Sequence, residues 1–407
     1  MRDRITRLSA MLVALQLAAP SLVDAQGDDP RRPALTAQAD TNDWMAYYDA
    51  GGRWLESDPK KAADAFHWAS KLDPTRPEPF YGRRMALLIE NPRRLVRYWR
   101  GERSTVRSRE IQRIDSLYLH ALTLNPFFYH RLDRVFLRKL ITELAEDLAP
   151  GSGITSGELR ILLDQSVNRA APGFRAWAAY AEGDFDRAEQ LYGQAMGETS
   201  NRRIKAGLMT ERARLYFQRD KADRALADLT AALAELRRTD RKDLIYVYES
   251  KALAEQGLGM VQKRLGNITA AREAFARSLQ EDLSYFPAHV QMAMLALDSK
   301  DTVAALSAMD LAVQIKPDDA GLRYMYGFTL SEIGRHAEAE EQLNRAIEIN
   351  AIYAAPRIAL AKVLEALGKP EEALTQYRAF LSLATRGDPR RREAQARVTA
   401  LAASGSP

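Results

Sequence analysis

The feature that most constrains this chain is a series of four alanines at a constant spacing. They are Ala271, Ala305, Ala339 and Ala373, and each lies 305 − 271 = 34 positions after the one before. Each alanine is followed four residues later by a large side chain, in the order Phe275, Met309, Leu343 and Tyr377. Each is preceded twelve residues earlier by a small residue, in the order Gly259, Ala293, Gly327 and Ala361. Small residues on two helices let the helices cross closely, and the large residue fills the space left between them. One such unit cannot bury its apolar face alone, so the spacing predicts stacked copies.

This series resembles the tetratricopeptide repeat family, whose 34-residue helix–turn–helix unit carries small, bulky and proline positions in this order. The resemblance covers about residues 252–386, with Pro317 at a helix exit and with glycines between the two helices of a unit, namely Gly266, Gly334 and Gly368. Weaker copies lie upstream, where Ala62, Ala188 and Ala225 each follow a small residue by twelve positions. The resemblance implies an all-α, right-handed solenoid of helix–turn–helix repeats that is irregular in its N-terminal half.

Composition and repeat spacing divide the chain into six segments. We expect a signal peptide, a flexible lead-in, an irregular helical region of similar repeats, a linker, a repeat array, and a capping helix with a loose tail, over residues 1–25, 26–41, 42–149, 150–157, 158–387 and 388–407. Within the third segment, Phe127–Leu148 has apolar residues at helical spacing and is predicted to form one helix. The distance from Ala225 to Ala271 is 271 − 225 = 46 positions, which predicts 46 − 34 = 12 extra residues near Arg237–Ser250.

The segment 1–25 has the pattern of a signal peptide. Three arginines lie before the apolar run Leu8–Ala19, and Val23-Asp24-Ala25 supplies the small residues that a signal peptidase prefers. A bilayer span needs roughly 20 apolar residues, so we expect no transmembrane segment after cleavage. The alternative is a disordered tail or an uncleaved anchor. The Arg-rich composition favours a bacterial source, and we expect export to the periplasm or secretion.

The sequence offers no pattern that is typical of a catalytic or metal site. It has no cysteine, which excludes disulfide bonds, a lipid anchor on cysteine and a cysteine nucleophile. The five histidines lack the spacing of metal ligands, and they are His67, His120, His130, His289 and His336. His130 and Asp133 lie three residues apart on a predicted helix, where a surface hydrogen bond is the expected role. We therefore expect no enzyme activity, no metal and no cofactor, and the alternative is an enzyme with an unfamiliar site.

Charge is small overall but concentrated in one stretch. The formal net charge of +5 falls to +4 when three arginines and two acids leave with the signal segment, which argues against nucleic acid as the partner. Residues 76–113, in contrast, hold eleven arginines and four glutamates, a net charge of +7. Arginines beside aromatic residues can bind phosphate or an anionic glycan through paired hydrogen bonds and stacking, which makes candidates of Arg94, Arg97, Trp99 and Arg100. The alternative is that these arginines lie on solvated helix faces.

The resemblance also implies a binding surface, the concave wall that successive first helices form. It assigns twelve residues to this groove: Gln256, Met260, Lys263, Val290, Met294, Leu297, Tyr324, Phe328, Ser331, Ile358, Lys362 and Glu365. The middle of the wall is rich in methionine and aromatic residues, which suits an amphipathic helix or an extended peptide. The alternative is that several of these side chains pack into the core. The family's clamp for a C-terminal carboxylate is not expected, because only Lys263 and Lys362 are present of the residues it needs.

Taken together, these patterns predict a non-catalytic exported scaffold that mediates protein–protein interaction. Its partner is expected to be a protein or peptide bound in the concave groove, and its role to be the assembly or secretion of a cell-envelope complex or polysaccharide. The alternative function is direct binding of an anionic glycan or a lipid head group through residues 76–113.

Overall fold

The computed structural model describes residues 29–91, 109–167, 172–238 and 250–404, and the chain is all-helical over these ranges. They contain nineteen helices and no strand. The N-terminal helices are α2 (Trp44–Trp54), α3 (Pro59–Leu72), α4 (Pro77–Ile89), α6 (Arg109–Leu124), α7 (Asp133–Leu148) and α8 (Ser156–Val167). None of the helices in the described ranges is both long enough and apolar enough to cross a bilayer.

From α9 onward the helices pack in consecutive pairs. The pairs are α9 (Pro172–Glu182) with α10 (Phe185–Glu198), α11 (Arg202–Gln218) with α12 (Ala222–Arg238), α13 (Lys251–Arg264) with α14 (Ile268–Glu281), α15 (Phe286–Asp298) with α16 (Thr302–Ile315), α17 (Ala320–Glu332) with α18 (His336–Ile349), and α19 (Ala354–Ala366) with α20 (Pro370–Leu383). The last helix is α21 (Arg391–Ser404). The extra residues expected near 237–250 fall between α12 and α13, where residues 239–249 lie outside the described ranges.

The packing within each pair confirms the prediction from the constant spacing. The four alanines of the series are fully buried, and so are the large residues that follow them. A Cβ atom added to Gly327 on α17 would lie 2.7 Å from Cγ of Leu343 on α18, which is closer than real Cβ contacts come. Gly259 on α13 stands in the same relation to Phe275 on α14. The helices of a pair therefore cross closely because one side is small where the other is large.

The turn inside each pair requires a left-handed backbone conformation. Gly266 ends the connection after α13 with φ +80°, and Gly334 and Gly368 have φ +80° and +73° at the same register. Lys300 occupies this register after α15 and also has a positive φ, +60°. Glycine adopts this conformation without steric cost, whereas a side chain such as that of Lys300 is tolerated there only when the flanking helices impose it.

Helices α2, α3 and α4 form a similar unit around one shared large residue. Phe66 on α3 is fully buried, and added Cβ atoms on Gly51 and Gly82 would lie 2.8 and 2.6 Å from its ring. Phe66 therefore fills the space between α2 and α4, as Phe275 and Leu343 do in the later pairs. We call α2, α3, α4 and α6, with the segment from residue 29 that precedes them, the N-terminal unit.

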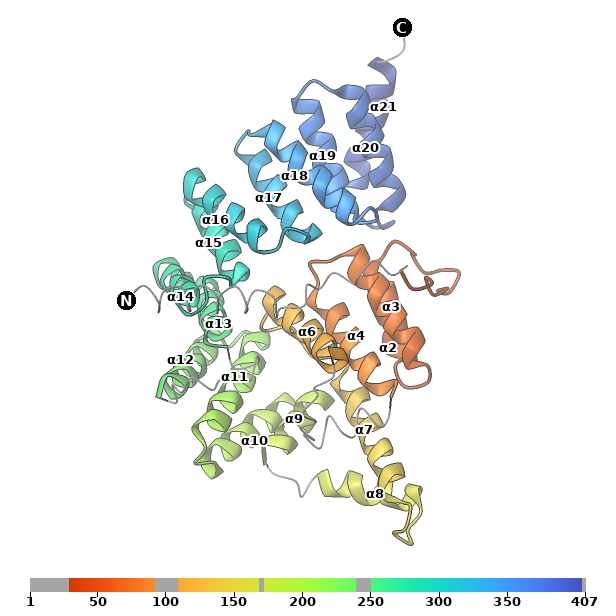
Figure 1. The fold of residues 1–407 in the computed structure, drawn as a ribbon, viewed down its shortest axis with the longest axis vertical. Coiled ribbons are helices and arrows are strands. Elements are labelled where there is room, and N and C mark those ends of the chain that lie inside the picture. The colour runs from red at the N-terminus through yellow and green to blue at the C-terminus, as the bar shows by residue number, and fades with distance from the viewer. Residues whose placement is uncertain (1–28, 92–108, 168–171, 239–249, 405–407) are drawn as a thin grey trace, which may run out of the picture.

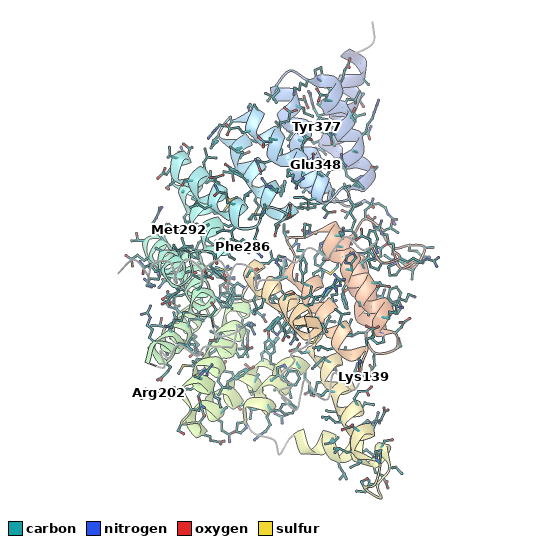
Figure 2. The ribbon with its side chains drawn as sticks, viewed as in Figure 1. Lys139, Arg202, Phe286, Met292, Glu348 and Tyr377 are labelled. Atoms are coloured by element: carbon teal, nitrogen blue, oxygen red, sulfur yellow. The ribbon has the colours of Figure 1, made fainter. Side chains whose placement is uncertain are left out.

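The helix pairs follow a curved path, and α4 and α6 of the N-terminal unit lie inside the curve (Figure 1). Neighbouring pairs share apolar clusters along this path. Phe286 belongs to the cluster of α15 to α17, and Tyr377 to the cluster at the C-terminal end (Figure 2). The array thus encloses helices of its own chain.

The N-terminal unit also contacts the C-terminal repeats, which lie at the opposite end of the sequence. Asn350 donates a hydrogen bond from Nδ2 to the carbonyl oxygen of Lys71, at 2.6 Å. The backbone N–H of Arg386 donates to Asp40 at 2.5 Å, and Asn42 donates to the carbonyl of Ser382 at 2.8 Å. These contacts join the two ends of the described chain. The composition of residues 26–41 predicted a flexible lead-in and gave no indication of these contacts.

The segment before α7 differs from its prediction. Phe127–Leu148 was expected to be one helix, but α7 begins only at Asp133, and residues 125–132 are not helical. The reason is that the side chains of Phe127, Phe128 and Leu132 are buried against other helices, and this tertiary packing overrides the helical spacing. His130 and Asp133 were expected at the surface and are both buried, so that expectation was also wrong.

Candidate binding groove

Each first helix of the array presents three residues at intervals of four and three, which places them on one helical face. The twelve predicted residues therefore form three rows that cross α13, α15, α17 and α19. The first row holds Gln256, Val290, Tyr324 and Ile358; the second Met260, Met294, Phe328 and Lys362; and the third Lys263, Leu297, Ser331 and Glu365. The rows differ in how much of each side chain remains accessible.

The first row is used largely within the protein. Gln256 is buried; it donates from Nε2 to the carbonyl of Thr123 on α6 at 3.3 Å and accepts a 2.6 Å hydrogen bond from the hydroxyl of Tyr285. Val290 and Ile358 are buried in the apolar clusters of their own helix pairs. Tyr324 meets the ring of Tyr353 edge-on, with centroids 5.6 Å apart. Most of this row thus stabilises the fold.

The second row contains the accessible apolar side chains. Met294 on α15 is 38% exposed, and Phe328 on α17 is 47% exposed. Met260 is half-buried against the clusters of α13 and α14, and Lys362 is exposed and lies 2.9 Å from Glu393 of α21. Two large apolar residues at equivalent positions of successive first helices therefore face solvent. Exposed apolar residues that repeat along one surface indicate an interaction site.

The third row places charges at its ends, and each charge is paired with a residue of a later helix. Lys263 lies 3.6 Å from Asp298, and Glu365 is paired with Arg397 of α21. Partial burial raises the pKa of Glu365, but hydrogen bonds from Arg397 and Tyr377 outweigh it and hold that pKa below its usual value. Leu297 and Ser331 between them are half-buried. The charged ends of the groove are therefore neutralised within the protein.

The same register continues into α9 and α11, where the sequence analysis did not follow it. In α13 the groove residues lie three positions before, one after and four after the small residue Gly259. The same offsets from Ala213 give Thr210, Arg214 and Phe217 on α11. Counting from Ala176, those of α9 include Trp177 and Tyr180. The twelve-residue spacing of the weaker repeats was sufficient to find these positions, but the irregular distance between Ala225 and Ala271 concealed them.

In α9, α11 and α13 these groove residues bind a segment of the chain itself, Thr123–Asp133. Arg214 donates from Nε to the carbonyl of Pro126 at 3.1 Å. Gln218, next to Phe217, donates to the carbonyl of Phe127 at 2.9 Å, and the ring of Phe127 stacks on Phe217 with centroids 4.2 Å apart. Gln256 on α13 also donates to the carbonyl of Thr123. Side chains of two successive first helices, α11 and α13, therefore bind three main-chain carbonyls. We call Thr123–Asp133 the internal segment.

The end of the internal segment is held by a buried carboxylate. Asp133 accepts hydrogen bonds from the Tyr81 hydroxyl at 2.5 Å and from Nε1 of Trp177 at 2.8 Å. His130 stacks on Tyr81 with centroids 4.4 Å apart, and burial lowers its pKa. Because Tyr81 belongs to α4 and Trp177 to α9, this carboxylate joins the N-terminal unit to the array.

Comparison with known proteins bears on the second half of the groove. A tetratricopeptide repeat model matches residues 296–351, from the end of α15 to just past α18. This chain contains tetratricopeptide repeats. The matched residues include Phe328 and lie within the part of the array where the constant spacing is found.

Solved structures give further likenesses to tetratricopeptide repeat proteins. YrrB, described as a TPR protein with an unusual peptide-binding site, is 19% identical at a TM-score of 0.38, over 50% of this chain and 96% of YrrB. The C-terminal part of a TPR repeat-containing protein from Cytophaga hutchinsonii is 12% identical at 0.46, over 56% and 91%. A MamA structure from Desulfovibrio magneticus RS-1 is 17% identical at 0.38, over 44% and 94%. No curated protein sequence matches the chain.

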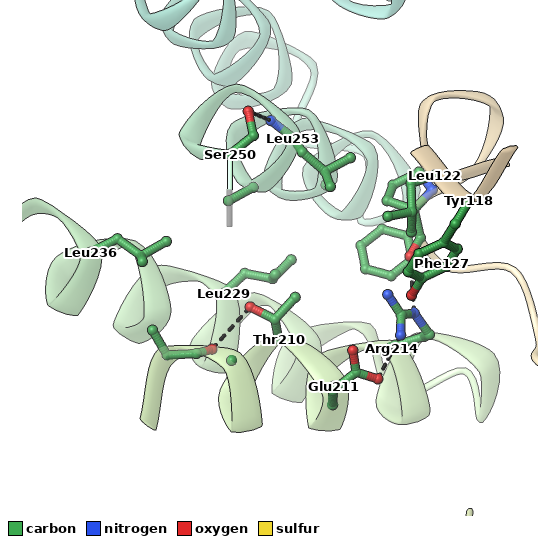
Figure 3. Close-up of a pocket in the computed structure, with 15 residues that line it drawn as sticks. Tyr118, Leu122, Phe127, Thr210, Glu211, Arg214, Leu229, Leu236, Ser250 and Leu253 are labelled. Carbon is green, nitrogen blue, oxygen red and sulfur yellow. Dashed lines mark hydrogen bonds and ion pairs between the residues drawn. The ribbon is translucent and has the colours of Figure 1, made fainter. Parts of the chain in front are cut away.

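A pocket of about 240 Å³ lies beside the internal segment, between α6, α11, α12 and α13 (Figure 3). Its walls are mainly apolar, with Leu122, Phe127, Leu229, Leu236 and Leu253 among them. Its polar side chains include Glu211 and Arg214, which are hydrogen-bonded to each other at 2.5 Å. Burial opposes the charge on Arg214, but Glu211 outweighs it and raises the pKa of the guanidinium, which stays charged.

The predicted anion-binding residues Arg94, Arg97, Trp99 and Arg100 lie outside the described residues. Two other arginines of the basic stretch are paired inside the chain. Arg76 donates to Asp73 at 3.0 Å, and Arg84 is buried 3.5 Å from Asp115. In the ranges that the structure covers, no three His, Asp or Glu side chains gather as metal ligands would.

Proposed function

We propose that this protein is a non-catalytic scaffold that binds another protein through the groove of α15 to α19. The observation that carries the proposal is the exposure of Met294 and Phe328, 38% and 47%, at equivalent positions of successive first helices. In α9 to α13 the corresponding wall is covered by the internal segment. The open groove is therefore the part of the concave wall that can accept a partner.

The internal segment supports this proposal, because it displays what the groove register can bind. It combines hydrogen bonds from groove side chains to main-chain carbonyls with one stacked aromatic ring, which is how an extended peptide is recognised. YrrB, a structure of similar type, is described as having a peptide-binding site. We propose a partner segment of similar chemistry, with an apolar or aromatic side chain on Met294 and Phe328.

We further propose that the protein is exported and acts in the assembly or secretion of a cell-envelope complex or polysaccharide. The basic start and the short apolar run within residues 1–25 support export. A fusion of residues 1–30 to a reporter that is active only outside the cytoplasm tests this step. An inactive fusion that is still expressed would contradict export and would leave the groove proposal untouched.

The groove is tested by photo-crosslinking in the native cell. A photoreactive amino acid at Met294 or Phe328 is expected to give one shared crosslinked partner. The matched control is Val303, which is 78% exposed on the second helix α16 and should not capture that partner. The double variant Met294→Asp with Phe328→Asp should lose the partner without loss of helicity. Capture of the same proteins at all three positions would refute the groove assignment.

The alternative of anion binding through residues 76–113 stays a prediction. Retention on an anionic polymer that falls with salt, and that is lost when Arg94, Arg97 and Arg100 are replaced by Ser, would favour it. Equal retention of the variant would exclude it.

A further inference from the structure

The pocket beside the internal segment, which we call the Arg214 pocket, has different chemistry at its two ends. Arg214 and Phe127 lie at one end, and Leu236 lies at the other, with Leu229 and Leu253 between them (Figure 3). A charged group at one end of an otherwise apolar pocket fits a molecule with a polar head and an apolar tail. At about 240 Å³ the space is smaller than most sites for drug-sized ligands, so the molecule is small.

The charged end has hydrogen-bonding capacity that the protein does not use. Arg214 is 4% exposed; its Nε donates to the carbonyl of Pro126 and its Nη1 to Glu211. Among the described residues these two hydrogen bonds engage Nε and Nη1 and not Nη2, and Arg214 is one of the side chains that line the pocket. An N–H group of a largely buried guanidinium that lines a pocket can donate to an acceptor placed there.

The acceptor that suits this position best is a carboxylate. Hydrogen bonds between ionised partners are roughly twice as strong as neutral ones, and Glu211, which also lines the pocket and whose side chain is 38% exposed, accepts only from Nη1 of the guanidinium. The remaining walls are mainly apolar and leave room for a hydrocarbon chain.

We propose that the Arg214 pocket binds a small aliphatic carboxylate, with one carboxylate oxygen on Nη2 of Arg214 and the hydrocarbon chain along Leu229, Leu253 and Leu236. This site is separate from Met294 and Phe328 and does not depend on the protein partner proposed above. It lies where α6 of the N-terminal unit meets α11, α12 and α13, so a bound molecule would hold these helices together.

The test uses octanoate as the probe and isothermal titration calorimetry on the full chain. The wild-type protein should bind one octanoate, and 1-octanol, which has the same length without the charge, should bind about tenfold more weakly or worse. Absence of octanoate binding, or equal binding of the acid and the alcohol, would overturn the proposal.

A variant that fills the pocket locates the site without removing any contact of the fold. Gly207 on α11 lines the pocket, and a Cβ atom added there would have no neighbour within 4 Å, so Gly207→Leu places its side chain in open space. This variant should lose octanoate binding by at least about tenfold. Gly197 on α10 also has no neighbour within 4 Å and does not line the pocket, so Gly197→Leu is the matched control and should bind as the wild type does.

A second variant tests the head group. Arg214→Met should abolish the preference for octanoate over 1-octanol, with retained helicity checked by circular dichroism. If Arg214→Met does not fold, the Gly207→Leu and Gly197→Leu pair still decides the location. Undiminished binding to Gly207→Leu would refute it.

Discussion

The two halves of this molecule use the same packing unit in different ways. In α13 to α20 each unit contacts the next at a constant interval, and the exposed groove residues Met294 and Phe328 repeat at that interval. In α2 to α7 the units are joined by a segment that leaves the helical path and enters the wall of α9 to α13. Where the repeat spacing is regular, the groove residues remain accessible. Where the spacing is irregular, the internal segment covers the equivalent wall of α9 to α13.

The largest effect is expected where the two halves are alike. Phe275→Ala in the array and Phe66→Ala in the N-terminal unit should each lower the free energy of unfolding by about 3–5 kcal/mol, because both rings are fully buried between small residues. Urea denaturation followed by circular dichroism measures both. The control Leu283→Ala, at a residue 78% exposed, should change the value by less than about 0.5 kcal/mol. A much smaller loss for Phe66→Ala than for Phe275→Ala would mean that the two units are not packed alike.

The next effect is expected at the joint between the halves. Trp177→Phe and Tyr81→Phe each remove one donor from the buried carboxylate of Asp133, which should cost about 1–3 kcal/mol. Tyr47→Phe is the matched control, because Tyr47 is buried as deeply as Tyr81 and is not one of the two donors to Asp133. If all three variants unfold at the same urea concentration, the carboxylate does not hold the joint.

Two glycines on first helices should respond in opposite directions. Gly327→Ala pushes a methyl group against Leu343 and should cost about 1–3 kcal/mol. Gly207→Ala adds the same methyl group in open space on α11 and should stabilise by about 0.5–1 kcal/mol, because alanine favours the helix. The same denaturation measurement checks both. If both changes stabilised the protein, α17 and α18 would not cross closely at Gly327.

A graded effect of pH should be confined to the N-terminal half. Burial lowers the pKa of His67, His120 and His130 below the usual value of about 6.5. Below pH 6.5 the unfolded chain therefore binds protons that the folded chain does not, so stability should fall as the pH is lowered from 7.5 to 5.5. Hydrogen exchange should show the loss in α3 to α7, and His130→Gln should reduce it. Equal losses in α17 to α20 would contradict this assignment.

The smallest effect is expected at the contact that joins the chain ends. Arg386→Ala removes an exposed side chain that interacts with Asp40 and with the carbonyl of Ala39, which should cost at most about 1 kcal/mol. Its signature is faster hydrogen exchange in residues 38–42 with no change at Phe275. Unchanged exchange in those residues would show that the backbone contact of Arg386 with Asp40 is sufficient.

The sequence by itself determined the helix pairs, because local spacing decides which residues share a helical face. The small and large positions from Gly259 to Tyr377 all lie where their constant interval predicted, and the turn register held even at Lys300. The groove residues could also be numbered from this interval, including Arg214 and Trp177 once the weaker repeats are counted in the same way. Only their accessibility stayed hidden, because neighbouring residues in sequence do not reveal what a distant segment covers.

Only the tertiary structure decided which groove residues are open. Arg214 and Met294 hold equivalent positions on their first helices, yet Arg214 is buried against Pro126 while Met294 faces solvent. The difference arises because residues 125–132 form no helix, an outcome that depends on contacts with Phe217 and Arg214 much later in the chain. Local preferences favour a helix there, and the burial of its aromatic side chains in the groove overrides them.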